Sequence, residues 1–222
     1  MALPGVSTLR VSGGNQGGFT VVIRHIIGLL SDPVREWERL RDEQCTVGKC
    51  FATHTLFLAA IPPICGFIGT TQIGWKIGAG EPVKLSLESA ATIAVLYYFA
   101  LLVAVLSVGA LIKWMGDTYG AKATLSRAVV LASYTATPLF LIGVFQLYPV
   151  LWLNMVLGLP ALAYSVYLLY TGLPIMMEVP PEKGFLYASA VLAVGLVVLV
   201  ASLAVTVLLW GHGFEPQFVP AG

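Results

Sequence analysis

Four residues place polar or helix-breaking chemistry inside two long apolar stretches of the sequence. Tyr134, Thr137 and Pro138 lie close together in one stretch, and Asn154 lies in the next. Tyr134 and Thr137 are three residues apart, so they would share one helix face. A hydroxyl or amide left unpaired in hydrocarbon costs a few kcal/mol, so we expect these groups to turn inward. They form a candidate intramembrane polar site, which either packs helices together or lines a path for a solute.

A second group with chemical potential has the spacing C-x4-C-x3-H and consists of Cys45, Cys50 and His54. Cys50 and His54 are four residues apart, so one helix face could present both side chains to a metal ion. A structural zinc site normally has four ligands, and the sequence offers no obvious fourth. The other interpretation is two small apolar cysteines and a hydrogen-bonded histidine. We predict no metal site and no cofactor.

A third group marks the start of a short charged helix. Asp32 is a favoured N-cap residue, and Pro33 suits the first helical position because its missing N–H costs nothing there. The segment 33–44 is dense in alternating charges and contains Trp37. Opposite charges three residues apart can pair along it (Glu36–Arg39 and Glu38–Arg41). It is either a solvated helix with an anchoring tryptophan or a docking surface for a cytoplasmic partner, built from Asp32, Pro33, Glu36 and Trp37.

Motifs for catalysis and nucleic-acid binding are absent from the sequence. It contains no HExxH, no GxSxG, no P-loop and no GxGxxG opening a helix. The net charge of +1 argues against a nucleic-acid partner, which would need a concentrated basic surface. Three cysteines are too few, and odd in number, for a disulfide scaffold. We therefore predict that the protein is not an enzyme.

The composition requires a membrane. Of the 222 residues, 58% are hydrophobic and only 10% are charged, against about 25% charged residues in an ordinary soluble domain. A helix needs about 20 apolar residues to cross a bilayer. Five runs of that kind occur, and none has a charged residue in its interior (50–71, 90–112, 128–147, 150–170 and 185–210). The sequence therefore predicts an all-α, five-transmembrane-helix bundle.

The remaining segments complete the predicted organisation. Residues 19–30 are apolar on one broad face but too short to span, with Arg24 and His25 opposite, which predicts an interfacial amphipathic helix in the membrane plane. We divide the chain into a flexible tail (1–18), an interfacial helix plus a charged helix (19–49), a membrane domain (50–210) and a short C-terminal tail (211–222).

Prolines and charges predict the shape and the orientation of the spans. Pro62-Pro63, Pro138 and Pro160 fall within spans one, three and four, where proline kinks or opens a helix. Ten of the 12 Lys and Arg residues lie on one side of a five-span arrangement, and only Lys76 and Lys84 lie on the other. Because positive residues favour the cytoplasm, we expect a cytoplasmic N-terminus and an external C-terminus.

Three motifs, in order along the chain, resemble the YIP family, the Ypt/Rab-interacting-protein membrane domain. They are residues 26–33 (IIGLLSDP) followed by Glu36-Trp37, residues 134–138 (YTATP), and residues 170–174 (YTGLP) with Val179-Pro180 and Lys183 after them. The resemblance implies five spans and a cytoplasmic N-terminus. Eukaryotic relatives bind Rab-type GTPases and act in vesicle traffic. The compact chain is similar to prokaryotic members, which implies the cytoplasmic (inner) membrane and no catalytic residues to carry over.

Two functions remain open at the level of sequence. The first is a non-enzymatic, membrane-organising or partner-binding protein that contacts the lipid bilayer and a cytoplasmic or membrane protein, or a second copy of itself. The second is a small-solute channel or transporter that uses the kinked spans one, three and four. The interfacial and charged helices favour the first, and the polar groups within the spans favour the second.

Overall fold

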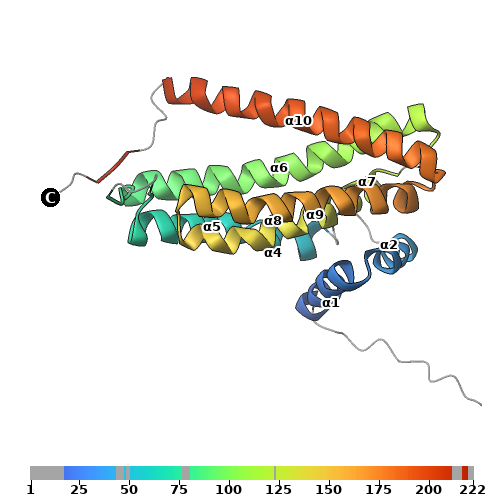
Figure 1. Ribbon diagram of the computed structural model, residues 1–222, viewed down its shortest axis with the longest axis horizontal. Coiled ribbons are helices and arrows are strands. Elements are labelled where there is room, and N and C mark those ends of the chain that lie inside the picture. The colour runs from blue at the N-terminus through green and yellow to red at the C-terminus, as the bar shows by residue number, and fades with distance from the viewer. Residues whose placement is uncertain are drawn as a thin grey trace, which may run out of the picture.

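The computed structural model describes residues 18–43, 48, 51–76, 81–122, 124–211 and 217–219. Helices make up most of this part of the chain, and the long ones run alternately up and down in a bundle (Figure 1). Five helical stretches are long and apolar enough to cross a membrane: Phe51–Ile73, Leu87–Tyr119, Leu125–Leu147, Leu151–Met177 and Pro181–Val205. The predicted all-α, five-span architecture is confirmed. Spans two and four end seven residues later than predicted, because a helix continues past the apolar run that identifies it.

Two of the five spans are interrupted near their prolines. The first consists of η1 (Phe51–Thr55), α4 (Leu56–Leu58), α5 (Ile61–Ile68) and η2 (Gly69–Ile73), and a turn at Ala59 precedes Pro62. The third consists of α7 (Leu125–Thr135), α8 (Thr137–Ile142) and η3 (Gly143–Leu147), and it breaks before Pro138. In both spans proline occupies the first turn of the new helix, where its missing N–H costs nothing.

The fourth span is one continuous helix. Helix α9 (Leu151–Met177) runs without interruption past Pro160 and Pro174, so of the two effects predicted for Pro160, a kink or a local opening, the opening does not occur. A proline removes one backbone donor, and the hydrogen bonds on both sides keep the rest of the helix in place. Helices α6 (Leu87–Tyr119) and α10 (Pro181–Gly211) are also continuous.

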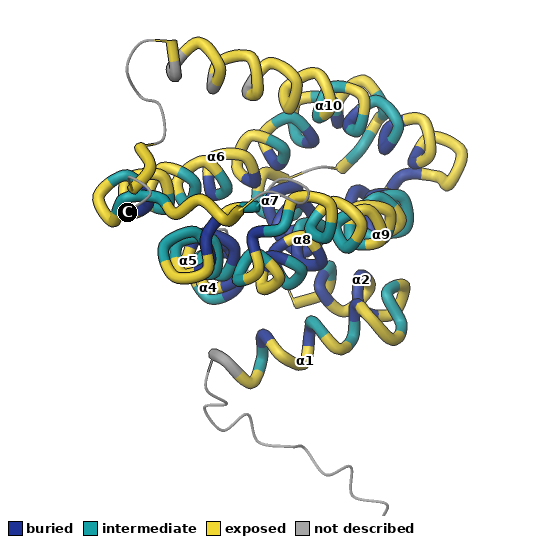
Figure 2. Tube along the Cα trace, turned by 60° about the vertical axis from the view of Figure 1, so that its left-hand side comes forward, coloured by how far each residue is buried: buried dark blue, intermediate teal, exposed yellow. Residues whose placement is uncertain are grey.

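The third span lies at the centre of the bundle. In its most apolar window 61% of residues are buried, against 12% for the last span. Figure 2 shows the same contrast, with buried residues gathered around α7 and α8 and exposed ones along α10. At Gly109 of α6 an added Cβ would lie 2.8 Å from Val129 of α7, so these two helices approach closely. Most of α10 therefore presents apolar side chains to lipid.

Contacts between loops fix which span ends lie together. At one end of the bundle the backbone N–H of Lys122 donates to the carbonyl of Met177 at 3.2 Å. At the other end, isolated β-bridges join Trp75 to Val83, Lys76 to Val150, and Leu85 to Phe218. Residues 217–219, in the predicted C-terminal tail, are thus paired with the segment before α6. Odd-numbered spans begin, and even-numbered spans end, at the first of these two ends.

Two short helices precede the bundle and lie against its side. Helices α1 (Gly18–Ser31) and α2 (Pro33–Asp42) meet at Asp32, whose carboxylate accepts a hydrogen bond from the backbone N–H of Arg35 at 3.3 Å. The predicted N-cap is confirmed. Figures 1 and 2 place both helices on one side of the bundle, close to α9. Most of the predicted flexible tail (residues 1–17), and Cys45 and Cys50, lie outside the described residues.

Candidate functional site between the N-terminal helices and the bundle

Tyr134 and Thr137 face the same neighbour, as their spacing predicted, and that neighbour is His54. The Nε2 of His54 and the Oγ1 of Thr137 are 2.9 Å apart, within hydrogen-bond distance. The rings of His54 and Tyr134 stack with centroids 4.0 Å apart. All three side chains are buried. Span three therefore presents its polar groups to span one, through the π-helical turn that carries His54.

Asn154 does not belong to this group. Its Nδ2 donates to the backbone carbonyls of Tyr148 at 2.8 Å and Val150 at 3.0 Å, which lie just before its own helix. Asn154 therefore provides a hydrogen-bond donor to backbone carbonyls at the start of α9, at the end of the bundle away from α1 and α2. Pro138 occupies the first turn of α8, beside Thr137, and shapes the break in span three. The predicted set is thus divided between two places.

A buried carboxylate joins α1 to α2. Glu36 Oε1 lies 2.5 Å from Nδ1 of His25, and Arg39 Nη1 donates to Glu36 Oε2 at 2.6 Å. The second ring nitrogen of His25 lies 3.5 Å from Oε2 of Glu43. His25 and Glu36 are each only 2% exposed. A carboxylate at such a position is stable only when it is paired and hydrogen-bonded, so Glu36 locks the two helices together. Glu36–Arg39 is one of the predicted pairs, whereas Arg41 bonds Asp42 rather than Glu38.

Tyr134 lies between the His25–Glu36 pair and His54 of span one. The ring of Tyr134 stands edge-on to the ring of His25, with centroids 5.6 Å apart, and it also stacks on the ring of His54. The cluster of His25, Glu36, His54, Tyr134 and Thr137, which we term the polar cluster, thus draws on α1, α2, η1, α7 and α8. It offers imidazole, carboxylate, phenol and hydroxyl groups side by side. These groups can exchange protons or hold helices in register.

Trp37 lies against the bundle rather than on the surface of the protein. Its side chain is fully buried, and a Cβ added at Gly172 of α9 would lie 2.5 Å from its indole ring. The hydroxyl of Tyr164 of α9 donates to the carbonyl of Leu29 at 2.6 Å. Of the four residues predicted to dock a partner, Glu36 and Trp37 are therefore buried inside the chain. Asp32 and Pro33 are half-buried at the turn.

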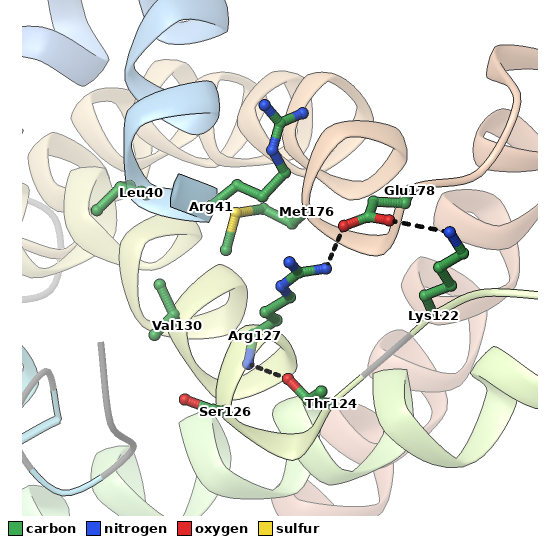
Figure 3. A pocket seen from close by; sticks show the side chains of 9 residues that line it. All are labelled: Leu40, Arg41, Lys122, Thr124, Ser126, Arg127, Val130, Met176 and Glu178. Atoms are coloured by element: carbon green, nitrogen blue, oxygen red, sulfur yellow. Dashed lines mark hydrogen bonds and ion pairs between the residues drawn. The ribbon is translucent and has the colours of Figure 1, made fainter. Parts of the chain in front are cut away.

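A second group of charges lies where α7 begins and α9 ends. Arg127 Nη1 donates to Glu178 Oε1 at 2.5 Å, and Lys122 Nζ lies 3.6 Å from Glu178 Oε2. The hydrogen bond and the charge of Arg127 hold the pKa of the Glu178 carboxyl below its usual value. Beside these residues is an open cavity of about 410 Å³ (Figure 3). The described residues include no group of three or more His, Cys, Asp or Glu that could hold a metal ion.

Two members of the polar cluster were missed or misplaced at the level of sequence. His25 was assigned to the polar face of α1, yet it is buried with Val22 and Leu29, which lie three residues before it and four after it. That helical spacing was the available signal. The interpretation of His54 as a hydrogen-bonded histidine agrees with the structure, but nothing in the sequence pairs it with Thr137, 83 residues away.

Comparison with known proteins gives the family. A family model described as "Yip1 domain" matches residues 27–202, from the second half of α1 into α10. The chain belongs to the Yip1 family. It is 44% identical, over 191 residues, to "Inner membrane protein YohC" of Escherichia coli strain K12, a match that covers 86% of this chain and 98% of that protein. The YohC protein of Escherichia coli O6:H1 matches equally well. No solved structure matches the chain significantly.

The match confirms the family resemblance read from the three motifs. The matched region includes the second half of α1, all of α2, spans one to four and most of the last span. It contains Glu36, His54, Tyr134 and Thr137 of the polar cluster and Gly172 beside Trp37.

Proposed function

We propose that this Yip1-family protein is a non-enzymatic membrane adaptor, which holds α1 and α2 as a fixed platform for a partner at the bilayer surface. The observation that carries the proposal is the two-sided character of these helices. One side is fastened to α9 by Trp37 against Gly172 and by the hydrogen bond from Tyr164 to the carbonyl of Leu29. The other side is exposed.

The exposed side divides into an apolar part and a charged part. The apolar part is mainly on α1, and Ile27 at its centre is 59% exposed. The charged part is on α2 and includes Arg35, Glu38 and Arg39. A helix with exposed apolar residues beside charges is suited to the headgroup zone of a bilayer. The apolar part would therefore rest in lipid and organise it, while the charged part would meet a protein partner.

This proposal includes a location and an orientation. The relative named as an inner membrane protein supports the cytoplasmic membrane. The ten-to-two distribution of Lys and Arg supports a cytoplasmic N-terminus and an external C-terminus. The platform would then face the cytoplasm.

Photo-crosslinking in intact cells tests the platform. A photoreactive amino acid at Glu38 should form one protein adduct of defined mass, and the same group at Ile27 should form lipid adducts. A mass twice that of the chain would identify a second copy as the partner. Gln72, which is exposed at the opposite end of the bundle, provides the matched control. Identical adducts at Glu38 and Gln72 would contradict the proposal.

A second candidate function, a small-solute channel or transporter, is favoured by one observation. The hydroxyls of Thr55, Ser133 and Ser165 are buried in spans one, three and four without a hydrogen-bond partner in the described part of the chain. Two of these spans are also interrupted, as a solute path would require. Flux of small solutes into liposomes containing the purified protein separates the two functions. Flux that falls in Tyr134→Phe while the melting temperature stays constant would favour the channel over the adaptor.

A further inference from the structure

The cavity beside Glu178 combines basic side chains with an apolar wall. Arg41 comes from α2, Arg127 from α7, and Lys122 from the segment before α7 (Figure 3). The same lining holds one carboxylate, that of Glu178, which pairs with Arg127 and Lys122. The wall beside them is apolar, because Leu40, Val130 and Met176 are buried and line the same cavity. A ligand that fits this lining needs negative charge at one end and hydrocarbon at the other.

The charges are arranged so that cationic donors remain for a ligand. Asp42 takes only the Nε of Arg41, at 3.0 Å, and a guanidinium carries five N–H donors. Arg127 and Lys122 share a single carboxylate, at 2.5 and 3.6 Å. The two cations are not fully buried, since the side chain of Lys122 is 79% exposed and that of Arg127 is 27% exposed. A second anion can therefore approach from the open side.

The position of the cavity indicates where that anion comes from. The cavity lies where α7 begins and α9 ends, which is the level at which spans three and four leave the hydrocarbon. Phospholipid phosphates lie at this level, with their acyl chains beside the spans. Arg forks recognise phosphate oxygens in pairs, and basic recesses between transmembrane helices are suited to anionic headgroups.

We propose that the cavity lined by Arg41, Lys122, Arg127 and Glu178 binds the phosphate of an anionic phospholipid. The part of an acyl chain nearest the headgroup would lie against Leu40, Val130 and Met176. Glu178 acts as an internal counter-ion that the phosphate must compete with for Arg127. The site does not rest on the proposed adaptor function, because the exposed residues Ile27 and Glu38 take no part in it. Either proposal can fail alone.

Lipid binding to the purified full-length chain tests this site. Phosphatidylglycerol and phosphatidylcholine are titrated into the detergent-solubilised protein, and retained lipid is counted by native mass spectrometry. Arg127→Gln should weaken phosphatidylglycerol binding about tenfold, which corresponds to 1.4 kcal/mol. Glu178→Gln removes the competing carboxylate and should strengthen binding. Lys183→Gln, which removes an exposed cation outside the cavity, should leave binding within about twofold, as expected for a screened surface charge.

Three results would overturn the proposal. Equal retention of the two lipids would show that the cavity does not select an anionic headgroup. An equal loss in Arg127→Gln and Lys183→Gln would show general surface attraction. Displacement of phosphatidylglycerol by an equal concentration of inorganic phosphate would identify a soluble phosphate as the ligand. If Arg127→Gln does not fold, the gain expected in Glu178→Gln carries the test, and an unchanged affinity there contradicts the proposal.

Discussion

Two pairs of buried polar side chains each join two different helical segments of this protein. His54 and Thr137 are separated by 83 residues and meet at 2.9 Å. His25 and Glu36 belong to different helices and meet at 2.5 Å. Tyr134 lies between the two histidines. Each pair satisfies groups that would be costly to leave unpaired in hydrocarbon. The polar cluster thus ties the N-terminal helices to spans one and three.

Replacement of Thr137 with valine tests the contribution of the hydrogen bond to His54. The change keeps the shape of the side chain and leaves the buried Nε2 of His54 without its partner. We expect the free energy of unfolding to fall by about 1–3 kcal/mol. The control is Thr171→Val, because that hydroxyl bonds the carbonyl of Tyr167 within its own helix. Denaturant unfolding in detergent measures both variants, and an equal loss in the two would contradict this role for Thr137.

The ion pair of Glu178 predicts a dependence of stability on pH. Arg127 lowers the pKa of this carboxyl from its ordinary value of 4.5. A lowered pKa in the folded state stabilises the protein above the unfolded pKa, and this contribution is lost as the pH falls through the folded pKa. The wild type should therefore melt higher than Glu178→Gln at about pH 7, and the difference should narrow below about pH 4.5. Thermal melts of both proteins across this range measure it. A difference that stays constant with pH would contradict the pairing.

Local spacing predicted part of the polar cluster and could not predict the rest. Tyr134 and Thr137 are three residues apart, and their shared direction was predicted correctly. Their spacing also allowed both side chains to point at the fourth span, and it left the partner open. The partner is instead His54, since the meeting of two spans depends on their packing and register, which helical spacing within one segment does not contain. Likewise, the need for a glycine at position 172 comes from its contact with Trp37, which is 135 positions earlier in the sequence.

At the scale of elements, α2 is held to α9 by the fit of one large side chain against one glycine. Trp37 lies against the backbone of α9 where Gly172 has no Cβ, and Leu40 follows on the same buried side. Arg35, Glu38 and Arg39 of α2 are exposed, whereas Glu36 is buried. Composition predicted this helix and its N-cap at Asp32, which the structure confirms. The sequence did not determine that the tryptophan faces the bundle, because Trp37 is equally suited to anchoring a helix in the headgroup zone.

Substitution of Gly172 with alanine should loosen α2. The new Cβ would lie 2.5 Å from the indole ring of Trp37, so Trp37 must move. Overpacking of this kind costs about 1–3 kcal/mol, and we expect faster amide hydrogen exchange across residues 33–42. Gly158→Ala on the same helix is the control, because no atom lies within 4 Å of its added Cβ. Unchanged exchange in Gly172→Ala, measured by mass spectrometry, would show that Trp37 does not hold α2 in place.

At the scale of the whole molecule, hydropathy predicted the five spans but not their arrangement. Each span is apolar along its length, yet span three is largely buried and the last span is largely exposed to lipid. Mean hydropathy cannot separate these cases, because a lipid-facing side chain and a core side chain are equally apolar. The close approach of α6 and α7 at Gly109 depends on a contact between spans. The prolines predicted a kink or an opening in spans one, three and four, and only spans one and three are interrupted.

The proposed orientation of the five-span bundle places α1 and α2 at the cytoplasmic face of the membrane and the C-terminal segment outside. Single cysteines at Arg35 and Gln217, both exposed, test it most directly in a chain whose Cys45, Cys50 and Cys65 are replaced by serine. A membrane-impermeant thiol reagent added to intact cells should label Gln217→Cys and should label Arg35→Cys only after permeabilisation. Labelling of Arg35→Cys in intact cells, or protection of Gln217→Cys, would contradict the account.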